Sequence, residues 1–192
     1  SDVSGVGTAR ADPAATEYGG DKGIFGYGHN SQSMTNLVSN SGVVATDTTG
    51  VGTGRHALKA CAYGGDKGIF GYGTTGSRVS LTNLISNVGV VATDTTGVGT
   101  ARNELGATEY GGDKGIFGFG TTGSNVSMTN LVSNAGVVAT DVTGVGTARQ
   151  GPAACGYGGD KGIFGYGNDG SNASMTNLVS NAGVVASDVT GV

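Results

Sequence analysis

Several residues in this 192-residue chain are of types that can do chemistry, beginning with a Gly-Gly-Asp-Lys segment that occurs four times. Glycine beside lysine is the composition of a phosphate-binding loop, but the G-x-x-x-x-G-K-[ST] spacing is absent and no helical pattern follows. We therefore predict a hairpin turn at each copy. Phosphate or ion binding by Asp66 and its equivalents is the alternative.

The two histidines and two cysteines are the candidate metal ligands that carry an imidazole or a thiol. His29 and His56 occupy non-equivalent positions in the repeat, whereas a catalytic zinc or copper site needs several converging ligands. Cys61 and Cys155 are equivalent, two repeats apart, and in a closed four-blade ring they would be too distant for a disulfide. We expect buried small cysteines, no metal, no cofactor and no catalytic residue.

Acidic and basic residues recur at a spacing of eight, also between Asp2 and Arg10. A repeated pair of opposite charges predicts structural ion pairs, and a recognition rim is the alternative. Exposed pairs of this kind contribute only about 0–1 kcal/mol each. The predicted pairs are Asp47 with Arg55, Asp94 with Arg102, and Asp141 with Arg149.

Two segments match the N-glycosylation sequon, Asn125-Val126-Ser127 and Asn172-Ala173-Ser174. They occupy matching positions in a loop of variable sequence, where the second repeat has Arg78. We therefore treat Asn125 and Asn172 as candidate glycosylation sites on a secretory route.

All twelve aromatic residues fall at three repeat positions, so none is left for a binding site that occurs in one unit only. In the strand around Ile69, alternation places Phe70 and Tyr72 on one face and Ile69, between glycines, on the other. Rings of one blade can then pack against gaps in the next, and an aromatic platform for sugars is the alternative. The twelve are Tyr18, Phe25, Tyr27, Tyr63, Phe70, Tyr72, Tyr110, Phe117, Phe119, Tyr157, Phe164 and Tyr166.

The elements that must position these residues follow a repeat of about 47 residues. Residues 1–192 form one predicted domain, with units at approximately 8–54, 55–99, 100–146 and 147–192. Turn residues divide the second unit into four predicted strands at 58–63, 67–73, 80–86 and 89–94. Four short strands in each unit predict an all-β fold, a β-propeller of four-stranded blades.

The two ends carry the same part of the repeat, SDVSGV at 1–6 and SDVTGV at 187–192. The overlap is consistent with an excerpt of a longer array. It is equally consistent with a ring in which residues 187–192 extend the outer strand that residues 1–6 begin, within one chain or between neighbours.

Composition narrows the function classes. Forty glycines and few charged residues, with abundant Val, Ile and Thr, indicate an ordered β protein. The net charge is −4 and the basic residues are scattered, which argues against nucleic-acid binding. No apolar run approaches the roughly 20 residues of a membrane span, so we expect no membrane insertion.

The second unit carries the clearest family resemblance. Arg55-His56, Gly-Gly-Asp-Lys-Gly-Ile-Phe-Gly-Tyr-Gly and Gly-Val-Val-Ala-Thr-Asp-Thr-Thr resemble a kelch-type propeller repeat, although the glycine pair is split in Gly71-Tyr72-Gly73 and the outer-strand Trp is missing. The repeat sequence is also similar to kelch-like repeats in environmental and viral sequences. That likeness implies a role in a surface, fibre or virion assembly and an extracellular or virion-surface location.

Three functions remain open. We expect a non-catalytic structural or adhesive protein that self-associates or joins other structural proteins. The alternative is a lectin-like propeller that binds glycans, and the third is an enzyme on a propeller scaffold, which would need unique polar residues at one spot. The residues that break the repeat, such as Asp12, Lys59, Glu104 and Gln150, fall in or near the variable segment after each arginine. Specificity, if any, is expected in that segment.

Overall fold

The computed structural model describes residues 5–190, which form β structure with no helix in that range. Twelve strands make four antiparallel sheets of three, one in each repeat. This confirms the all-β class. The sheets are β1 Ala14–Tyr18, β2 Lys22–Gly28 and β3 Gln32–Val38; β4 Lys59–Tyr63, β5 Lys67–Gly71 and β6 Thr82–Ile85; β7 Gly106–Tyr110, β8 Lys114–Gly118 and β9 Thr129–Val132; and β10 Ala153–Tyr157, β11 Lys161–Gly165 and β12 Thr176–Val179.

The Gly-Gly-Asp segment forms the hairpin turn between the first two strands of each sheet, as predicted. In the second sheet Tyr63 pairs with Lys67, so the turn consists of the three residues between them. Gly64 and Gly65 have φ angles of 64° and 77°, a region that glycine enters without steric cost. The repeated glycine pair is therefore a requirement of this turn.

A longer loop joins the second and third strands. In the second unit it is closed by an isolated bridge between Thr74 and Arg78. The first unit is two residues shorter, and β2 continues instead to Gly28, which pairs with Gln32 across an exposed tight turn. The two-residue difference in length therefore falls in an exposed turn and leaves the pairing of the second and third strands intact.

The predicted fourth strand of each blade is wrong. The segment after β6 pairs with that strand only at two isolated bridges, Ile85 with Val91 and Thr82 with Thr95, and the second of these lies just beyond the predicted residues 89–94. The bridges are three residues apart on one strand (85 − 82) and four on the other (95 − 91), so the register slips by one. Asn83 occupies the slip, and its side-chain amide donates to the Ala92 carbonyl at 3.0 Å.

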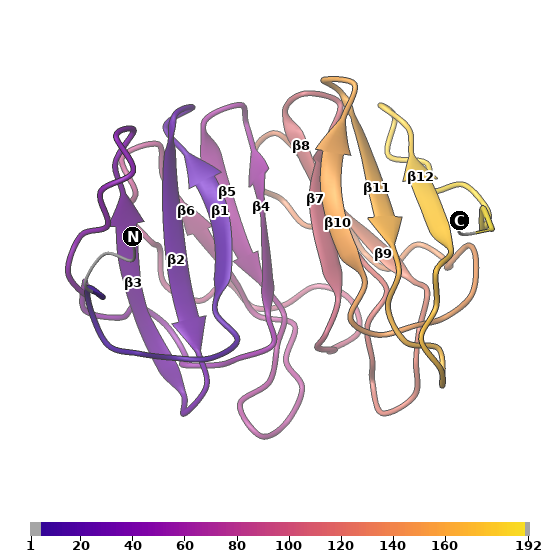
Figure 1. The fold of residues 1–192 in the computed structure, drawn as a ribbon, viewed down its shortest axis with the longest axis horizontal. Helices are drawn as coiled ribbons and strands as arrows, with labels where there is room; N and C mark the ends of the chain where they lie inside the picture. The colour runs from indigo at the N-terminus through magenta and orange to yellow at the C-terminus, as the bar shows by residue number, and fades with distance from the viewer. Residues whose placement is uncertain (1–4, 191–192) are drawn as a thin grey trace.

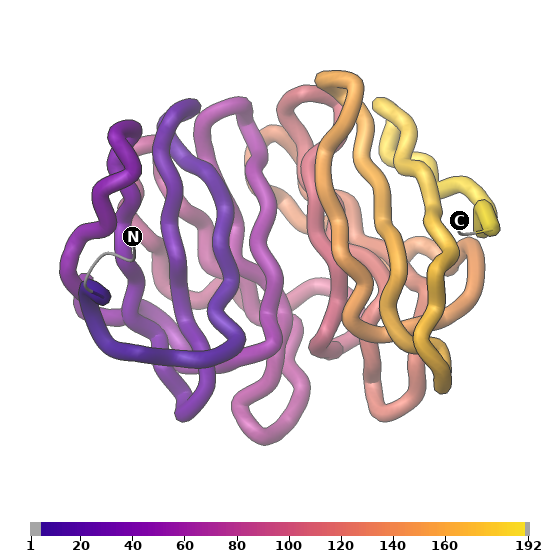
Figure 2. The backbone as a smooth tube through the Cα atoms, in the orientation of Figure 1, coloured from indigo at the N-terminus to yellow at the C-terminus, as the bar shows by residue number. Residues whose placement is uncertain are grey.

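The four sheets form a row in which each contacts the next through its first strand. β1 lies against β4, β4 against β7, and β7 against β10, and each first strand also contacts the second strand of the following sheet. In Figure 1 these four first strands gather in the middle, whereas β3 and β12 lie at the outer sides, so the sheets fan outward. Figure 2 shows the first and the last sheet, coloured indigo and orange to yellow, on opposite sides of the row.

One hypothesis is that residues 187–192 complete a strand with residues 1–6. The described part of the C-terminal segment is arranged differently. Val189 pairs with Thr176 of its own unit, the same pairing that Thr48 makes with Thr35 in the first unit. Residues 1–4 and 191–192 lie outside the described part of the chain. Residues 187–190 therefore complete the fourth unit itself.

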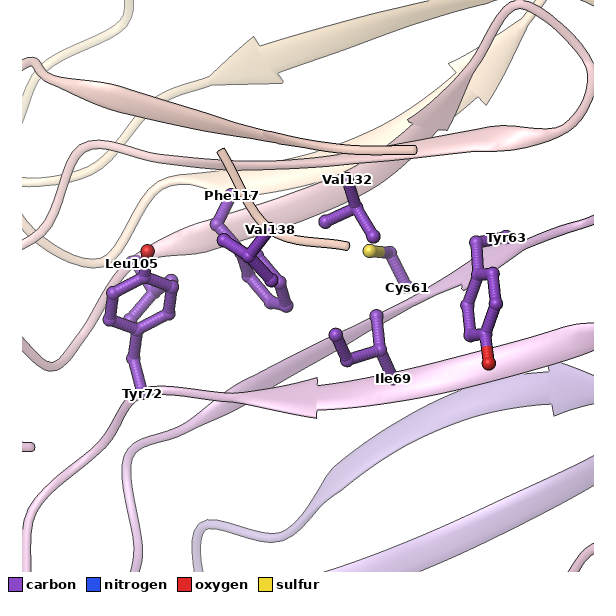
Figure 3. Close-up of a cluster of buried hydrophobic side chains, with 8 residues drawn as sticks. All are labelled: Cys61, Tyr63, Ile69, Tyr72, Leu105, Phe117, Val132 and Val138. Atoms are coloured by element: carbon purple, nitrogen blue, oxygen red, sulfur yellow. The ribbon is translucent and has the colours of Figure 1, made fainter. Parts of the chain in front are cut away.

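Hydrophobic side chains fill the spaces between successive sheets. Between the second and third sheets, Ile69 and Tyr72 from one side meet Phe117, Leu105 and Val132 from the other, as Figure 3 shows. Full burial of such a side chain contributes about 1.5–3 kcal/mol. The sheets are thus held together by junctions that recur at each step of the repeat.

Candidate functional site

In each of the last three units one arginine is fully buried within a polar network. Arg55 donates from Nε to the Tyr72 carbonyl at 2.8 Å, and from Nη2 to Asn83 Oδ1 at 2.7 Å. Its Nη1 donates to the Thr53 carbonyl at 3.1 Å. Burial of this fully enclosed side chain lowers the pKa of its guanidinium. Equivalent sets surround Arg102, with Phe119, Thr100 and Asn130, and Arg149, with Tyr166, Thr147 and Asn177.

An aspartate ties this network to the segment that leads into the sheet. Asp94 accepts from the Thr53 backbone N–H at 2.9 Å and from the Thr53 hydroxyl at 2.6 Å, and its other oxygen accepts from Asn83 at 2.9 Å. Burial alone would raise the pKa of Asp94, but the Thr53 and Asn83 hydrogen bonds outweigh it and hold that pKa below its ordinary value. The carboxylate therefore stays charged and fixes the start of its own sheet.

The predicted pairing of aspartate and arginine eight residues apart is wrong, although the residues themselves form ion pairs. The eight-residue spacing spans the connection from the outer edge of one sheet to the start of the next, so the two side chains belong to successive networks. Each arginine instead pairs with the aspartate beside the third strand of its own unit. The pairs are Arg10–Asp47 at 3.7 Å, Arg55–Asp94 at 3.8 Å, Arg102–Asp141 at 3.8 Å and Arg149–Asp188 at 3.9 Å. Asp2 lies outside the described residues.

Each buried arginine also stacks on an aromatic ring of the preceding unit. The Arg55 Cζ lies 4.4 Å from the centre of the Tyr27 ring, and Phe70 meets the same ring edge-on at 5.1 Å between centroids. A guanidinium over an aromatic face gains about 2 kcal/mol when desolvated. The same arrangement links Arg102, Tyr72 and Phe117, and then Arg149, Phe119 and Phe164.

The prediction that Phe70 and Tyr72 share a face is wrong. Phe70 packs against Tyr27 of the preceding unit, whereas Tyr72 packs against Phe117 of the following one. The strand ends at Gly71, and Tyr72 has a φ of 63°, which turns its side chain to the opposite side. The packing of ring against gap is confirmed, since a Cβ on Gly26 would lie 2.5 Å from Phe70 Cζ.

Nine of the twelve aromatics are at most 4% exposed. The other three lie in the two end sheets: Phe25 is 42% exposed in the first, and Tyr157 and Tyr166 are 39% and 57% exposed in the fourth. A repeated sugar platform needs exposed rings in every unit. The aromatic positions within the row are therefore packing residues.

The variable segments after the arginines meet in one depression of about 470 Å³ at the centre of the fan. Asp12, Ala57, Glu104 and Gly151 are equivalent positions, and all four have φ between 51° and 63°. The Glu104 N–H donates to the Ala57 carbonyl at 3.1 Å, and the Gly151 N–H donates to the Glu104 carbonyl at 2.7 Å. These turns thus link successive units at the rim.

Three of the four residues noted as breaking the repeat line this depression: Asp12, Lys59 and Glu104. They are scattered in the sequence but gathered in space, because each unit contributes its variable segment to the same centre. The signal that could have found the site is the shared alignment position of these segments. The arrangement offers two carboxylates and one ammonium to a polar ligand.

The histidines and cysteines occupy different surroundings. His29 and His56 come from adjacent units, and their ring centres lie 4.5 Å apart, a proximity that their non-equivalent positions did not suggest. Cys61 is buried as predicted, and burial raises the pKa of its thiol to about 12, whereas Cys155 is exposed. Within residues 5–190, no group of three or more His, Cys, Asp or Glu side chains is placed to hold a metal ion.

The sequon asparagines lie in the loops between second and third strands. Asn172 is exposed, and Asn125 is half-buried and donates to the Asn168 carbonyl of the next unit at 2.9 Å. Glycosylation at either stays a prediction. Over the part of the chain that the structure describes, no helix is long and apolar enough to cross a membrane.

The comparisons with known proteins add no family to this description. No protein-family model matches the chain, and no curated protein matches it.

Proposed function

We propose that this chain is a non-catalytic structural or adhesive repeat protein of a surface, fibre or virion assembly. The observation that carries the proposal is the use of the repeated polar residues in packing. All three guanidinium nitrogens of Arg55 donate hydrogen bonds to the second sheet and to the segment that leads into it, and the guanidinium face covers Tyr27 of the unit before. The residues that recur most regularly therefore hold each unit together and bind it to the unit before.

A kelch-like propeller arrangement of the sheets fits the same observations. At the centre, the first strand of each sheet lies beside the first strand of the next sheet, and the sheets fan outward, as blades do around an axis (Figure 1). An arginine precedes each first strand, which is the placement that the kelch resemblance implies. The proposed blade has three regular strands and an irregular outer segment held by Asn83 and its equivalents.

Localisation in the native setting tests the proposal. An antibody against the chain should label the outer surface of intact cells or particles that carry the protein, as seen by immunogold electron microscopy. Label that is confined to the interior after permeabilisation would contradict the surface role. A preparation from which the protein has been depleted is the control.

A lectin-like function is the second candidate, favoured by the polar depression that Asp12, Lys59 and Glu104 line. Charged groups in a concave site can hydrogen-bond to a glycan that carries several hydroxyls or an amine. Glycan-array binding that is lost in the triple variant Asp12→Ala, Lys59→Ala, Glu104→Ala, but kept in Arg78→Ala, would establish this function. Absence of binding at millimolar glycan would remove it.

A further inference from the structure

The two outer sheets carry the opposite halves of a junction that the molecule forms three times internally. At each internal junction a phenylalanine ring of the later sheet covers a glycine of the earlier one. A Cβ on that glycine would lie 2.5–2.8 Å from the ring, so the fit requires glycine. The pairs are Gly26 with Phe70, Gly71 with Phe117, and Gly118 with Phe164.

The C-terminal sheet has the glycine without the ring. Gly165 is the fourth member of the series, and the nearest atom to a Cβ there is Thr176 Cγ2 of its own sheet at 3.3 Å. An open pocket of about 400 Å³ surrounds it, lined mainly by apolar residues that include Ile163 and Tyr166. Tyr166 is 57% exposed, although its equivalents Tyr27 and Tyr72 are fully buried under an arginine and a phenylalanine.

The N-terminal sheet has the ring without the glycine. Phe25 occupies the place of Phe70 and Phe117 in its own sheet, as its pairing with Asn36 shows, yet it is 42% exposed while they are fully buried. The kind of ring that fills each internal junction is therefore exposed to solvent at this end.

A second contact runs in the other direction across each internal junction. Thr16, Cys61 and Thr108 project from the first strand of one sheet onto a glycine of the next, and a Cβ on Gly115 would lie 2.5 Å from Cys61 Sγ. At the C-terminal end the equivalent residue is the exposed Cys155. At the N-terminal end the equivalent glycine is Gly23, which has room for a Cβ, its nearest neighbour being Val38 at 3.6 Å.

Backbone groups complete the match. Across the internal junctions Gly19, Gly64 and Gly111 N–H donate to the carbonyls of Asp66, Asp113 and Asp160, each at 2.7 Å. The next donor in this series is Gly158 N–H in the last sheet, and the acceptor before the series is the Asp21 carbonyl in the first. The same hydrogen bond can therefore form between copies.

We propose that the C-terminal sheet of one copy binds the N-terminal sheet of a second copy, head to tail, with Phe25 seated over Gly165 and Cys155 against Gly23. The occupant is a second copy because every contact repeats one that this chain already makes. The inference rests on the proposed structural function and names its partner. Contacts of this heterologous kind close into a ring or extend as a filament according to the rotation between copies.

Complementation between two variants tests the junction. Gly165→Ala places a methyl where the Phe25 ring must sit, while only Thr176 is near it in the free chain, and Phe25→Ala removes the ring from the other end. By light scattering we expect wild type to exceed the 18.7 kDa mass of one chain as concentration rises, and each variant alone to associate at least about tenfold more weakly. An equimolar mixture of the two should form a dimer, because the Gly165→Ala variant keeps an intact N-terminal sheet and the Phe25→Ala variant an intact C-terminal sheet. The dimer cannot grow, because both of its free ends carry a substitution.

Cross-linking supplies an independent measurement. In the variant Gly23→Cys, oxidation with diamide should join the introduced thiol to Cys155 of another copy, each thiol losing a hydrogen to the diamide as the S–S bond forms. Adding Cys155→Ser should abolish this link. Gly115→Cys, which faces Cys61 within one chain, is the control that should give no intermolecular product.

A chain that stays monomeric to millimolar concentration, with no cross-link and no dimer in the mixture, would overturn the head-to-tail junction. Surface labelling would then still decide the structural function. Conversely, association with purely internal labelling would keep the junction and remove the proposed function.

Discussion

At the scale of residues, the buried arginine makes several polar contacts in each of the last three units. It joins the start of the sheet, the end of the second strand and the third strand of one unit, and it covers the ring of the unit before. An isolated charge in such a position would be very costly. The hydrogen bonds to the carbonyl groups and the asparagine, together with the charge of the nearby aspartate, offset that cost. Arginine suits the position because its planar fork donates in several fixed directions at once.

Replacing this arginine should strongly destabilise the fold. Arg102→Ala removes three hydrogen-bonding groups, leaves Asn130 Oδ1 without its donor and removes the cation that faces Asp141. We expect a loss of about 3–5 kcal/mol in the free energy of unfolding, measured by urea titration. Arg78→Ala is the matched control, because that arginine is exposed, and it should cost less than about 1 kcal/mol. Equal effects of the two substitutions would contradict the assigned role.

The buried tyrosines should make the protein sensitive to alkali. Burial raises the pKa of Tyr27 and of Tyr72 to about 12, against an ordinary value of about 10. Between these values only the unfolded chain releases the proton, so the free energy of unfolding should fall as pH rises from 10 to 12. Each tyrosine contributes at most about 1.4 kcal/mol per pH unit.

The double variant Tyr27→Phe, Tyr72→Phe should flatten this pH dependence in urea titrations between pH 9 and 12. At neutral pH it should lose about 0.5–1.5 kcal/mol per site, since the hydroxyls donate to the Val51 and Val98 carbonyls. The natural Phe119 shows that the position accepts a ring without a hydroxyl, being fully buried with Phe164 at its edge. An unchanged slope would show that other groups control the alkaline transition.

At the scale of elements, the sheets fit together because a glycine in each second strand admits the ring of the next. Gly71→Ala should therefore cost about 1–3 kcal/mol, since its Cβ would lie 2.6 Å from Phe117 Cζ. Gly165→Ala is the same substitution at the equivalent position of the last sheet, with only Thr176 nearby. Under dilute, monomeric conditions its melting temperature should match wild type, and a similar loss for both variants would refute the junction geometry.

The sequence is sufficient to predict the first three strands of each unit, because turn residues mark their ends and the repeat supplies four copies of each signal. Residues 89–94 have equally strong β propensity, yet the side chain of Asn83 takes over the bonding that a regular fourth strand would need. The turn of Tyr72 to the other face also escaped prediction, since alternation presumes that the extended backbone continues. A positive φ at a tyrosine has no signal in a local pattern.

The partners of the polar groups were also not predictable from local sequence. Spacing along the chain suggested Asp94 with Arg102, but the folded partner of Arg102 is Asp141. The central depression is likewise assembled from segments about one repeat apart, so its residues look scattered until the fan of sheets is known. Local pattern predicts elements well, whereas partners across units depend on how the elements stack.

At the scale of the whole molecule, the row behaves as a nearly one-dimensional array in which each sheet is stabilised by its neighbours. Sheets in the middle are covered on both faces, and the end sheets on one. The difference is visible at equivalent positions: Tyr63 and Tyr110 are 4% exposed, whereas Tyr157 is 39% exposed. Local opening should therefore begin at the ends.

Hydrogen–deuterium exchange followed by mass spectrometry checks this order. In dilute wild type we expect amides of β11 and β12 to exchange at least about tenfold faster than those of β5 and β8, because sub-global opening needs less free energy where one neighbour is missing. Raising the protein concentration should slow exchange in β10–β11 and in β1–β2 together, since each end then covers the other. Gly165→Ala should abolish that concentration dependence while leaving the dilute pattern unchanged. Equal protection across all four sheets would mean that the row unfolds as a single cooperative unit, and protection at only one end would mean that the two faces do not meet.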